Sequence, residues 1–142
     1  LLGSGSLKQS LLDREESWLR VLEPVPHAQV APFLQSLDVF AMPSHVTPDH
    51  EEHDGHALME ALACGVSCVG SDSGIIPELL DNNAGLVFTA GDIEELTSQL
   101  LRLVKDTSLR QNLGANAAQQ AAALFSNDGI ARQKIRIYAN AA

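Results

Sequence analysis

The stretch DVFAMPSHVTPDHEEHDGHALMEALACGVSCVGSDSG, residues 38–74, holds the elements that decide the fold. Residues 38–42 form a near-continuous hydrophobic run, which is typical of a strand buried on both faces of a parallel sheet. After a long polar loop, a helix is predicted over 55–64, with glycine as its N-cap and Gly65 as a left-handed stop. The next strand is predicted over 66–70, so the stretch contains a strand–helix–strand unit.

The flanking segments continue this alternation of strands and helices. Apolar spacing predicts a helix over 7–14, a strand over 18–22 and a helix over 27–37. Strand and helix alternating along the chain imply right-handed crossovers and a doubly wound parallel sheet, a Rossmann-like α/β fold. The further elements predicted downstream are a short helix at Pro77, a strand over 85–88, a helix behind an Asp92 and Glu95 capping box, and helices over 108–124 and 128–139.

Length and charge exclude several classes of protein. At 142 residues, the chain suffices for one compact domain over 1–142 with a core that needs no disulfide or metal. It has a formal net charge of -9 and only 9 Lys and Arg residues, which argues against a nucleic-acid partner. No apolar run approaches the roughly 20 residues that a transmembrane segment needs.

The cysteines and the first residues bear on location. Cys64 and Cys68 fall at a predicted helix end and in a predicted strand, where free thiols act as small buried hydrophobes. Nothing in their spacing indicates an oxidising compartment. Residues 1–5 lack the pattern of a signal peptide and are typical of a strand end with a tight turn. We therefore expect a cytoplasmic fragment of a larger protein, or one peripheral to a membrane through a domain outside this chain.

Three loops follow predicted strands and are candidate ligand sites. In a doubly wound sheet, ligands bind at the carboxyl ends of the strands. The loops over 3–5, 44–55 and 71–74 meet this condition. The loop over 44–55 is also longer than most connections between elements, and such loops are often functional.

The second of these loops leads into a set of groups suited to a nucleotide sugar. Gly55 opens a helix whose first N-H groups, on His56 and Ala57, are free to bind a phosphate. Glu60 lies about one and a half turns into the helix, and helical side chains lean toward the N-terminus, so its carboxylate can reach back to a ribose. Glu52, just before the helix, can accept a hydrogen bond from a sugar hydroxyl.

Glu52 and Glu60 match the Glu-x7-Glu motif of the group 1 family of retaining glycosyltransferases, enzymes of the two-domain GT-B fold. The resemblance covers the whole chain and is specific in its combination of motifs. Two positions depart from the family pattern: Asp54 replaces an aromatic residue, and Ile75 replaces Gly or Ala. The further matching motifs are Gly3-Ser4-Gly5, Val25-Pro26, Pro43-Ser44, Thr47-Pro48, residues 61–65, 70–74, 76–78 and 84–88, Gly91-Asp92, Phe125 and Tyr138.

The resemblance implies a role for each matching residue. Glu60 resembles the acid that binds the ribose hydroxyls of the donor, and Glu52 resembles the catalytic-site acid that contacts the transferred sugar. The N-H groups of residues 55–57 resemble those that hold the distal phosphate. Val25 lies in the turn that resembles the edge receiving the base, and Gly5 lies in a glycine-rich turn that the family places in the donor site.

For the whole enzyme, the resemblance implies a C-terminal, donor-binding half of a GT-B fold. Its partners would be a nucleotide-sugar donor, as substrate, and an N-terminal acceptor domain of the same protein outside this chain. The implied reaction retains the anomeric configuration and needs neither a cofactor nor a metal. By itself, this chain would be inactive.

Three alternatives remain open. His45, His50, His53 and His56 lie among acidic residues and contain the right groups for a metal site, but spacing in a loop does not determine coordination geometry. The turn over 71–74 also resembles one in nucleotide-sugar epimerases of related GT-B fold, which release a free altered sugar. A non-catalytic nucleotide-binding module is the third alternative.

Overall fold

A computed structural model describes residues 1–14, 16–48 and 51–140. Its contacts divide the chain into two compact units, Leu1–Phe33 and Leu34–Ala142, and each is described by itself. The expectation of one domain over the whole chain stays a prediction. None of the helices within the described ranges is long and apolar enough to cross a bilayer.

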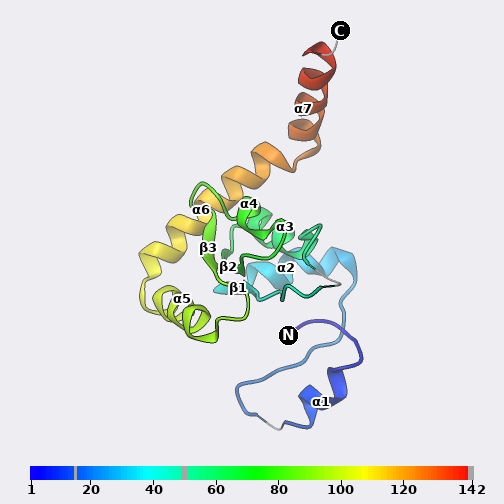
Figure 1. The fold of residues 1–142 in the computed structure, drawn as a ribbon. Helices are drawn as coiled ribbons and strands as arrows, with labels where there is room; N and C mark the ends of the chain where they lie inside the picture. The colour runs from blue at the N-terminus through cyan, green and yellow to red at the C-terminus, as the bar shows by residue number, and fades with distance from the viewer. Residues whose placement is uncertain (15, 49–50, 141–142) are drawn as a thin grey trace. The chain divides into compact units, whose positions relative to one another are not determined.

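The larger unit is built on three parallel strands, β1 (Val39–Met42), β2 (Ser67–Ser71) and β3 (Gly85–Phe88), in that order (Figure 1). Val39 pairs with Ser67, and Cys68 pairs with Gly85. The central strand β2 is buried at every position, as expected for a strand covered on both faces. The predicted parallel α/β sheet is confirmed.

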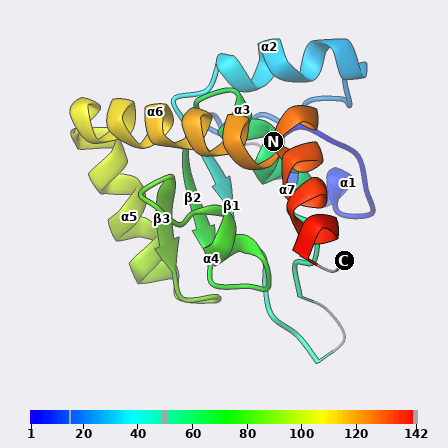
Figure 2. The same cartoon turned by 90° about the horizontal axis from the view of Figure 1, so that it is seen from above.

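Alternate residues of β2 face different helices. Val69 packs with Phe88, Leu103 and Leu113 in the main core, which α5 (Ile93–Lys105) and α6 (Thr107–Leu124) supply from one side. On the other side, a Cβ on Gly70 would meet Ile76 of α4 (Ile76–Leu79). Figure 2 accordingly shows the strands between α6 and α4. The central strand is thus buried between helices, whereas β1 is half-buried and exposed at Ala41, contrary to the prediction for residues 38–42.

Helix α3 (His56–Ala63) connects β1 to β2 and also packs against α6. Its ends agree with the predicted caps, since Gly55 and Gly65 have φ values of 61° and 71°. Gly65 and Gly114 meet without side chains between them, because a Cβ on Gly114 would lie 2.3 Å from the Gly65 carbonyl oxygen. Helix α7 (Asn127–Asn140) follows α6.

The predicted capping box before α5 is only half formed. The Asp92 carboxylate accepts a hydrogen bond from the N-H of Glu95 at 2.8 Å, as predicted. The Glu95 carboxylate, however, accepts from the N-H of Thr89 at 2.7 Å, because the N-H of Asp92 already donates to the Thr89 carbonyl. The helix start therefore has one cap of its own and one bond to the preceding loop.

The smaller unit contains α1 (Lys8–Leu12), the short 3-10 helix η1 (His27–Gln29) and the start of α2 (Val30–Gln35). The predicted strand over 18–22 is wrong, since only Leu22 forms an isolated parallel bridge, to Leu2. Trp18 lies in a turn with its side chain exposed, and its indole N-H donates to Glu16. A strand needs a continuous partner, and here only the short segment around Leu2 is opposite.

Candidate functional site

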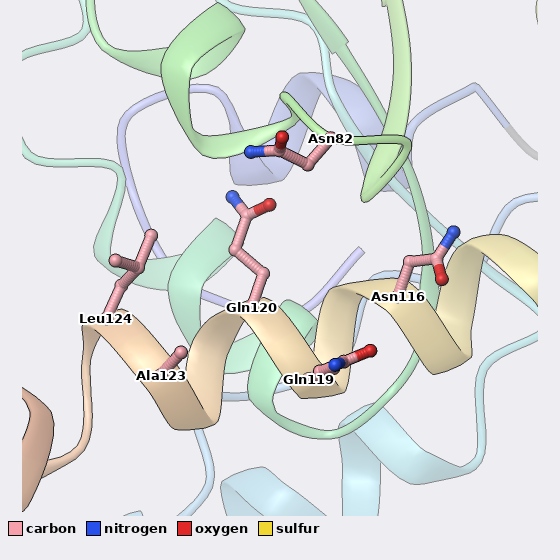
Figure 3. Close-up of a pocket in the computed structure, with 6 residues that line it drawn as sticks. All are labelled: Asn82, Asn116, Gln119, Gln120, Ala123 and Leu124. Atoms are coloured by element: carbon pink, nitrogen blue, oxygen red, sulfur yellow. The ribbon is translucent and has the colours of Figure 1, made fainter.

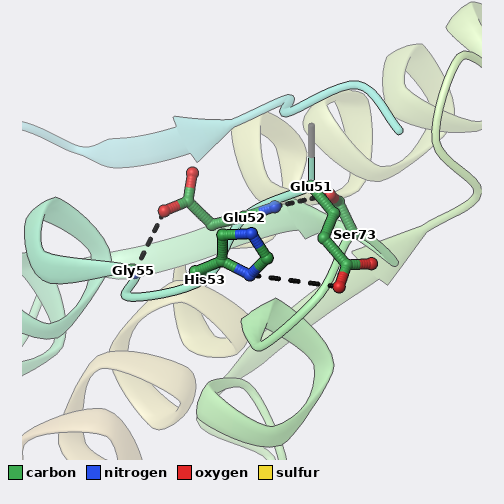
Figure 4. A network of polar contacts seen from close by, with 5 residues as sticks. All are labelled: Glu51, Glu52, His53, Gly55 and Ser73. Carbon is green, nitrogen blue, oxygen red and sulfur yellow. Dashed lines mark hydrogen bonds and ion pairs between the residues drawn. The ribbon is translucent and has the colours of Figure 1, made fainter. Parts of the chain in front are cut away.

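Two of the three predicted loops meet at the carboxyl end of the sheet. The Ser71 hydroxyl donates to the Ser44 carbonyl at 2.7 Å, which ties the end of β2 to the loop after β1. The N-H of Ile75 donates to the Glu52 carbonyl at 3.0 Å. The N-H of Glu52 donates to the Ser73 hydroxyl at 3.2 Å, as Figure 4 shows. The main chain at Glu52 is thus held on both sides by the turn after β2.

The Glu52 carboxylate is engaged within the protein. One oxygen accepts the N-H of Gly55 at 3.1 Å, and the other accepts the Ser44 hydroxyl at 3.2 Å. The side chain therefore holds the N-H of Gly55, the residue that precedes α3, while the Asp54 side chain is exposed. We call Ser44, Glu52, Gly55 and Ser73 the Glu52 brace. A carboxylate has about four lone-pair positions, so it can still accept a further hydrogen bond.

Gly55 of the brace and the neighbouring Gly74 both occupy positions where the fold favours glycine. A Cβ on Gly74, which has a φ of 51°, would lie 1.8 Å from the Glu52 carbonyl oxygen. A Cβ on Gly55 would lie 2.5 Å from a methyl group of Leu79. These contacts explain both glycines without a ligand. The sequence analysis placed Ser44 and Ser73 in matching motifs, but nothing in the sequence indicated that their hydroxyls bind Glu52.

The first turn of α3 presents donors to solvent. Within the described ranges, the N-H groups of His56 and Ala57 have no hydrogen-bond partner, and both residues are exposed. These groups form the positive end of the helix dipole. The structure thus leaves these donors open, and anion binding by them stays a prediction.

Glu60 lies one turn further along α3 and is exposed. It lines a hollow of about 570 Å³, which is otherwise largely apolar. Burial raises the pKa of the Cys64 thiol, and the negative charge of Glu60 raises it further. The other lining residues are His56, Met59, Ala63, Leu124, Phe125, Ile130 and Gln133.

Gly5 and Val25 belong to the smaller unit. The Gly5 carbonyl accepts the N-H of Lys8 at 3.1 Å, and the residue borders a hollow of about 220 Å³. A Cβ added to Gly5 would meet nothing within 4 Å, so the fold of this unit does not require glycine there. Val25 is half-buried within the same unit. Their roles in a donor site stay predictions.

The metal alternative receives no support from side-chain geometry. Residues 1–14, 16–48 and 51–140 contain no group of three or more His, Cys, Asp or Glu side chains placed to hold an ion. His53 pairs with Glu51 at 3.9 Å, and both are exposed (Figure 4). His50 and Asp49, which the metal hypothesis also used, lie outside the described residues.

A parallel sheet packed between helices, with its loops gathered at the carboxyl end, defines a Rossmann-like α/β fold. The sequence matches the family Glycosyl transferases group 1 over residues 11–120, and the chain belongs to this family. The resemblance to this family, which the sequence analysis based on the combined motifs, is confirmed.

Individual relatives agree with the family. The chain is 35% identical over 89 residues to N-acetyl-alpha-D-glucosaminyl L-malate synthase of Bacillus anthracis, covering 62% of this chain and 23% of the relative. It is 32% identical over 123 residues to O-antigen chain mannosyltransferase B of Escherichia coli, covering 87% of this chain and 30% of the relative. The chain therefore spans less than a third of the length of either protein.

Solved structures show the same fold. Sucrose-phosphate synthase from Thermosynechococcus elongatus superposes with a TM-score of 0.75 at 24% identity, over 94% of this chain and 33% of that one. Anabaena HepE in complex with UDP superposes with a TM-score of 0.71 at 24% identity, over 85% of this chain and 32% of that one. The predicted GT-B relationship of the fold is confirmed.

Proposed function

We propose that this chain is the donor-binding half of a retaining glycosyltransferase, which moves a sugar from a nucleotide-diphosphate sugar to an acceptor. The observation that supports this most directly is the start of α3. There, the N-H groups of His56 and Ala57 are open, and the Glu60 carboxylate is exposed one turn further on. Backbone donors at a helix N-terminus suit a phosphate, and a carboxylate suits the two hydroxyls of a ribose.

In this proposal, Glu52 has two tasks. Its carboxylate holds the N-H of Gly55 and the Ser44 hydroxyl, which positions the start of α3. Its remaining lone pairs accept a hydroxyl of the transferred sugar. A carboxylate already held by the protein is preorganised for that contact, so little entropy is lost when the sugar binds.

The rest of the enzyme completes the site. The chain's net charge of -9 repels a diphosphate, so helix dipole and backbone donors need positive groups from elsewhere in the protein to stabilise the leaving group. We propose that an N-terminal acceptor domain of the same protein supplies them. The reaction then needs no metal or separate cofactor, and the enzyme works in the cytoplasm or at its membrane surface.

Two experiments test the proposal. Calorimetry of the chain with UDP, GDP and ADP should detect weak binding of at least one nucleotide, while binding of none would contradict the donor-site assignment. In the full-length enzyme, product analysis should find the sugar on an acceptor. A free, altered sugar would instead identify an epimerase.

Replacement of Glu60 tests its role directly. Glu60→Ala in the full-length enzyme should lower kcat/KM at least about tenfold, because a hydrogen bond to a charged group contributes roughly 1.5–3 kcal/mol. Glu94→Ala, which removes an exposed glutamate from α5, is the matched control and should leave kcat/KM unchanged. Wild-type kinetics in Glu60→Ala would remove this residue from the site.

A further inference from the structure

A second hollow of about 370 Å³ lies along α6, and four of its six lining residues carry a carboxamide (Figure 3). Its volume falls in the range of small-molecule sites, roughly 300–1,000 Å³. None of the six lining residues is charged. They are Asn82, Asn116, Gln119, Gln120, Ala123 and Leu124.

The turn that contributes Asn82 has a defined geometry. Asn82 and Asn83 have φ values of 55° and 59°, and the N-H of Ala84 donates to the Asp81 carbonyl at 3.0 Å. Two positive φ values inside this hydrogen bond define a type I′ turn, in which asparagine is favoured. The Asn116 amide donates to the Asn83 carbonyl at 3.2 Å and so ties the turn to α6.

Gln120 supplies an acceptor that the protein does not satisfy. Its amide nitrogen donates to the Leu79 carbonyl at 3.0 Å, which fixes the orientation of the side chain. Its amide oxygen is buried, and within the described part of the chain it has no hydrogen-bond partner. A buried acceptor without a partner is unfavourable, which favours any small movement of the lining that brings a donor to it.

The chemistry of this lining selects a class of ligand. Each carboxamide both donates and accepts, which matches adjacent hydroxyl groups. The absence of a cationic residue among the six, together with the net charge of -9, disfavours phosphates and carboxylates. Ala123 and Leu124 add an apolar surface on which the C-H face of a pyranose ring can lie.

We propose that this carboxamide hollow is a binding site for a neutral saccharide, separate from the donor site. The two hollows meet at Leu124, which lines both. Of the two, only the hollow lined by His56 and Glu60 borders the open N-H groups of α3. The nucleotide would be recognised by these N-H groups, and the neutral sugar by the carboxamides. The proposal holds whether or not the start of α3 binds a nucleotide.

The test is a titration followed by NMR on the isotopically labelled chain. Methyl α-D-mannopyranoside and methyl α-D-glucopyranoside are the probes, glycerol is the control for a generic polyol, and UDP is a separate arm. At least one glycoside should shift the side-chain amide signals of Asn116, Gln119 and Gln120 saturably, with a Kd on the order of 1–10 mM. UDP should shift the signals of His56 and Ala57 instead. If UDP caused no shifts, that result would count against the donor site only, and not against the saccharide site.

Gln119→Ala is the decisive variant. Gln119 is exposed on α6, its carboxamide has no partner in the described ranges, and alanine favours helix, so the fold should be unaffected. Binding should weaken about three- to tenfold through loss of a ligand hydrogen bond. Asn112→Ala, an exposed carboxamide on the same helix outside the hollow, should bind as the wild type does. Absence of saturable shifts with both glycosides, equal shifts with glycerol, or wild-type affinity in Gln119→Ala would overturn the proposal.

Discussion

Replacing Gly74 by alanine should disrupt the contact between the two loops of the candidate site. The new Cβ would lie 1.8 Å from the Glu52 carbonyl oxygen, so the Glu52 segment must move away. That movement breaks the bond from Ile75 N-H to the Glu52 carbonyl and the bond from Glu52 N-H to the Ser73 hydroxyl. The two bonds contribute about 0.5–1.5 kcal/mol each, and a left-handed alanine costs roughly 1–2 kcal/mol. We expect a total destabilisation of about 2–5 kcal/mol.

Gly91→Ala is the matched control for this prediction. Gly91 also has a positive φ, 86°, but a Cβ there would meet nothing within 4 Å. It should therefore show only the conformational cost of roughly 1–2 kcal/mol. Urea unfolding of the chain and both variants, followed by circular dichroism, measures the difference. If Gly74→Ala were no less stable than Gly91→Ala, the close approach of the two loops would be refuted.

Two further predictions concern stability. Asp92→Ala should lower the free energy of unfolding by about 1 kcal/mol through loss of the helix cap, while Asp92→Asn, which keeps an acceptor, should lose much less in the same urea titration. Burial raises the pKa of the Cys68 thiol from 9.0 to about 12, so the folded state keeps a proton that the unfolded state releases above pH 9. Stability should therefore fall with pH between 9 and 12 by up to about 1.4 kcal/mol per unit. Unfolding of Cys68→Ala over the same pH range should lack this component, and an identical pH slope in both proteins would contradict it.

The elements of the larger unit could be predicted because their sequence signals are local. Runs such as residues 38–42 indicate strands, and Gly55 and Gly65 mark the ends of α3. The expectation that this strand is buried on both faces was wrong, since β1 is half-buried at three positions and exposed at Ala41. The local sequence pattern was not sufficient to decide whether residues 18–22 form a strand. An apolar run forms a strand only where a partner segment lies opposite, and the run itself does not reveal whether one does.

The location of the candidate site could be predicted from the sequence, but most of its contacts could not. The carboxyl ends of parallel strands meet at one edge, so the loops at 44–55 and 71–74 were expected to be neighbours. The Glu52 brace was not predictable, since it depends on how closely Gly74 lets two main-chain segments approach. From the sequence, Glu52 was expected to accept a hydrogen bond from a sugar hydroxyl. In the structure, its oxygens already accept hydrogen bonds from the Gly55 N-H and the Ser44 hydroxyl.

The contact between Gly65 and Gly114 has a consequence for engineering this domain. Because backbone meets backbone there, the separation of α3 and α6 does not depend on the size or rotamer of any intervening side chain. Exposed residues of α6 that make no contact of this kind, such as Gln119, can therefore be exchanged while the helix keeps its place. Substitution of exposed α6 residues can therefore change which ligand binds, provided that Gly65 and Gly114 are kept.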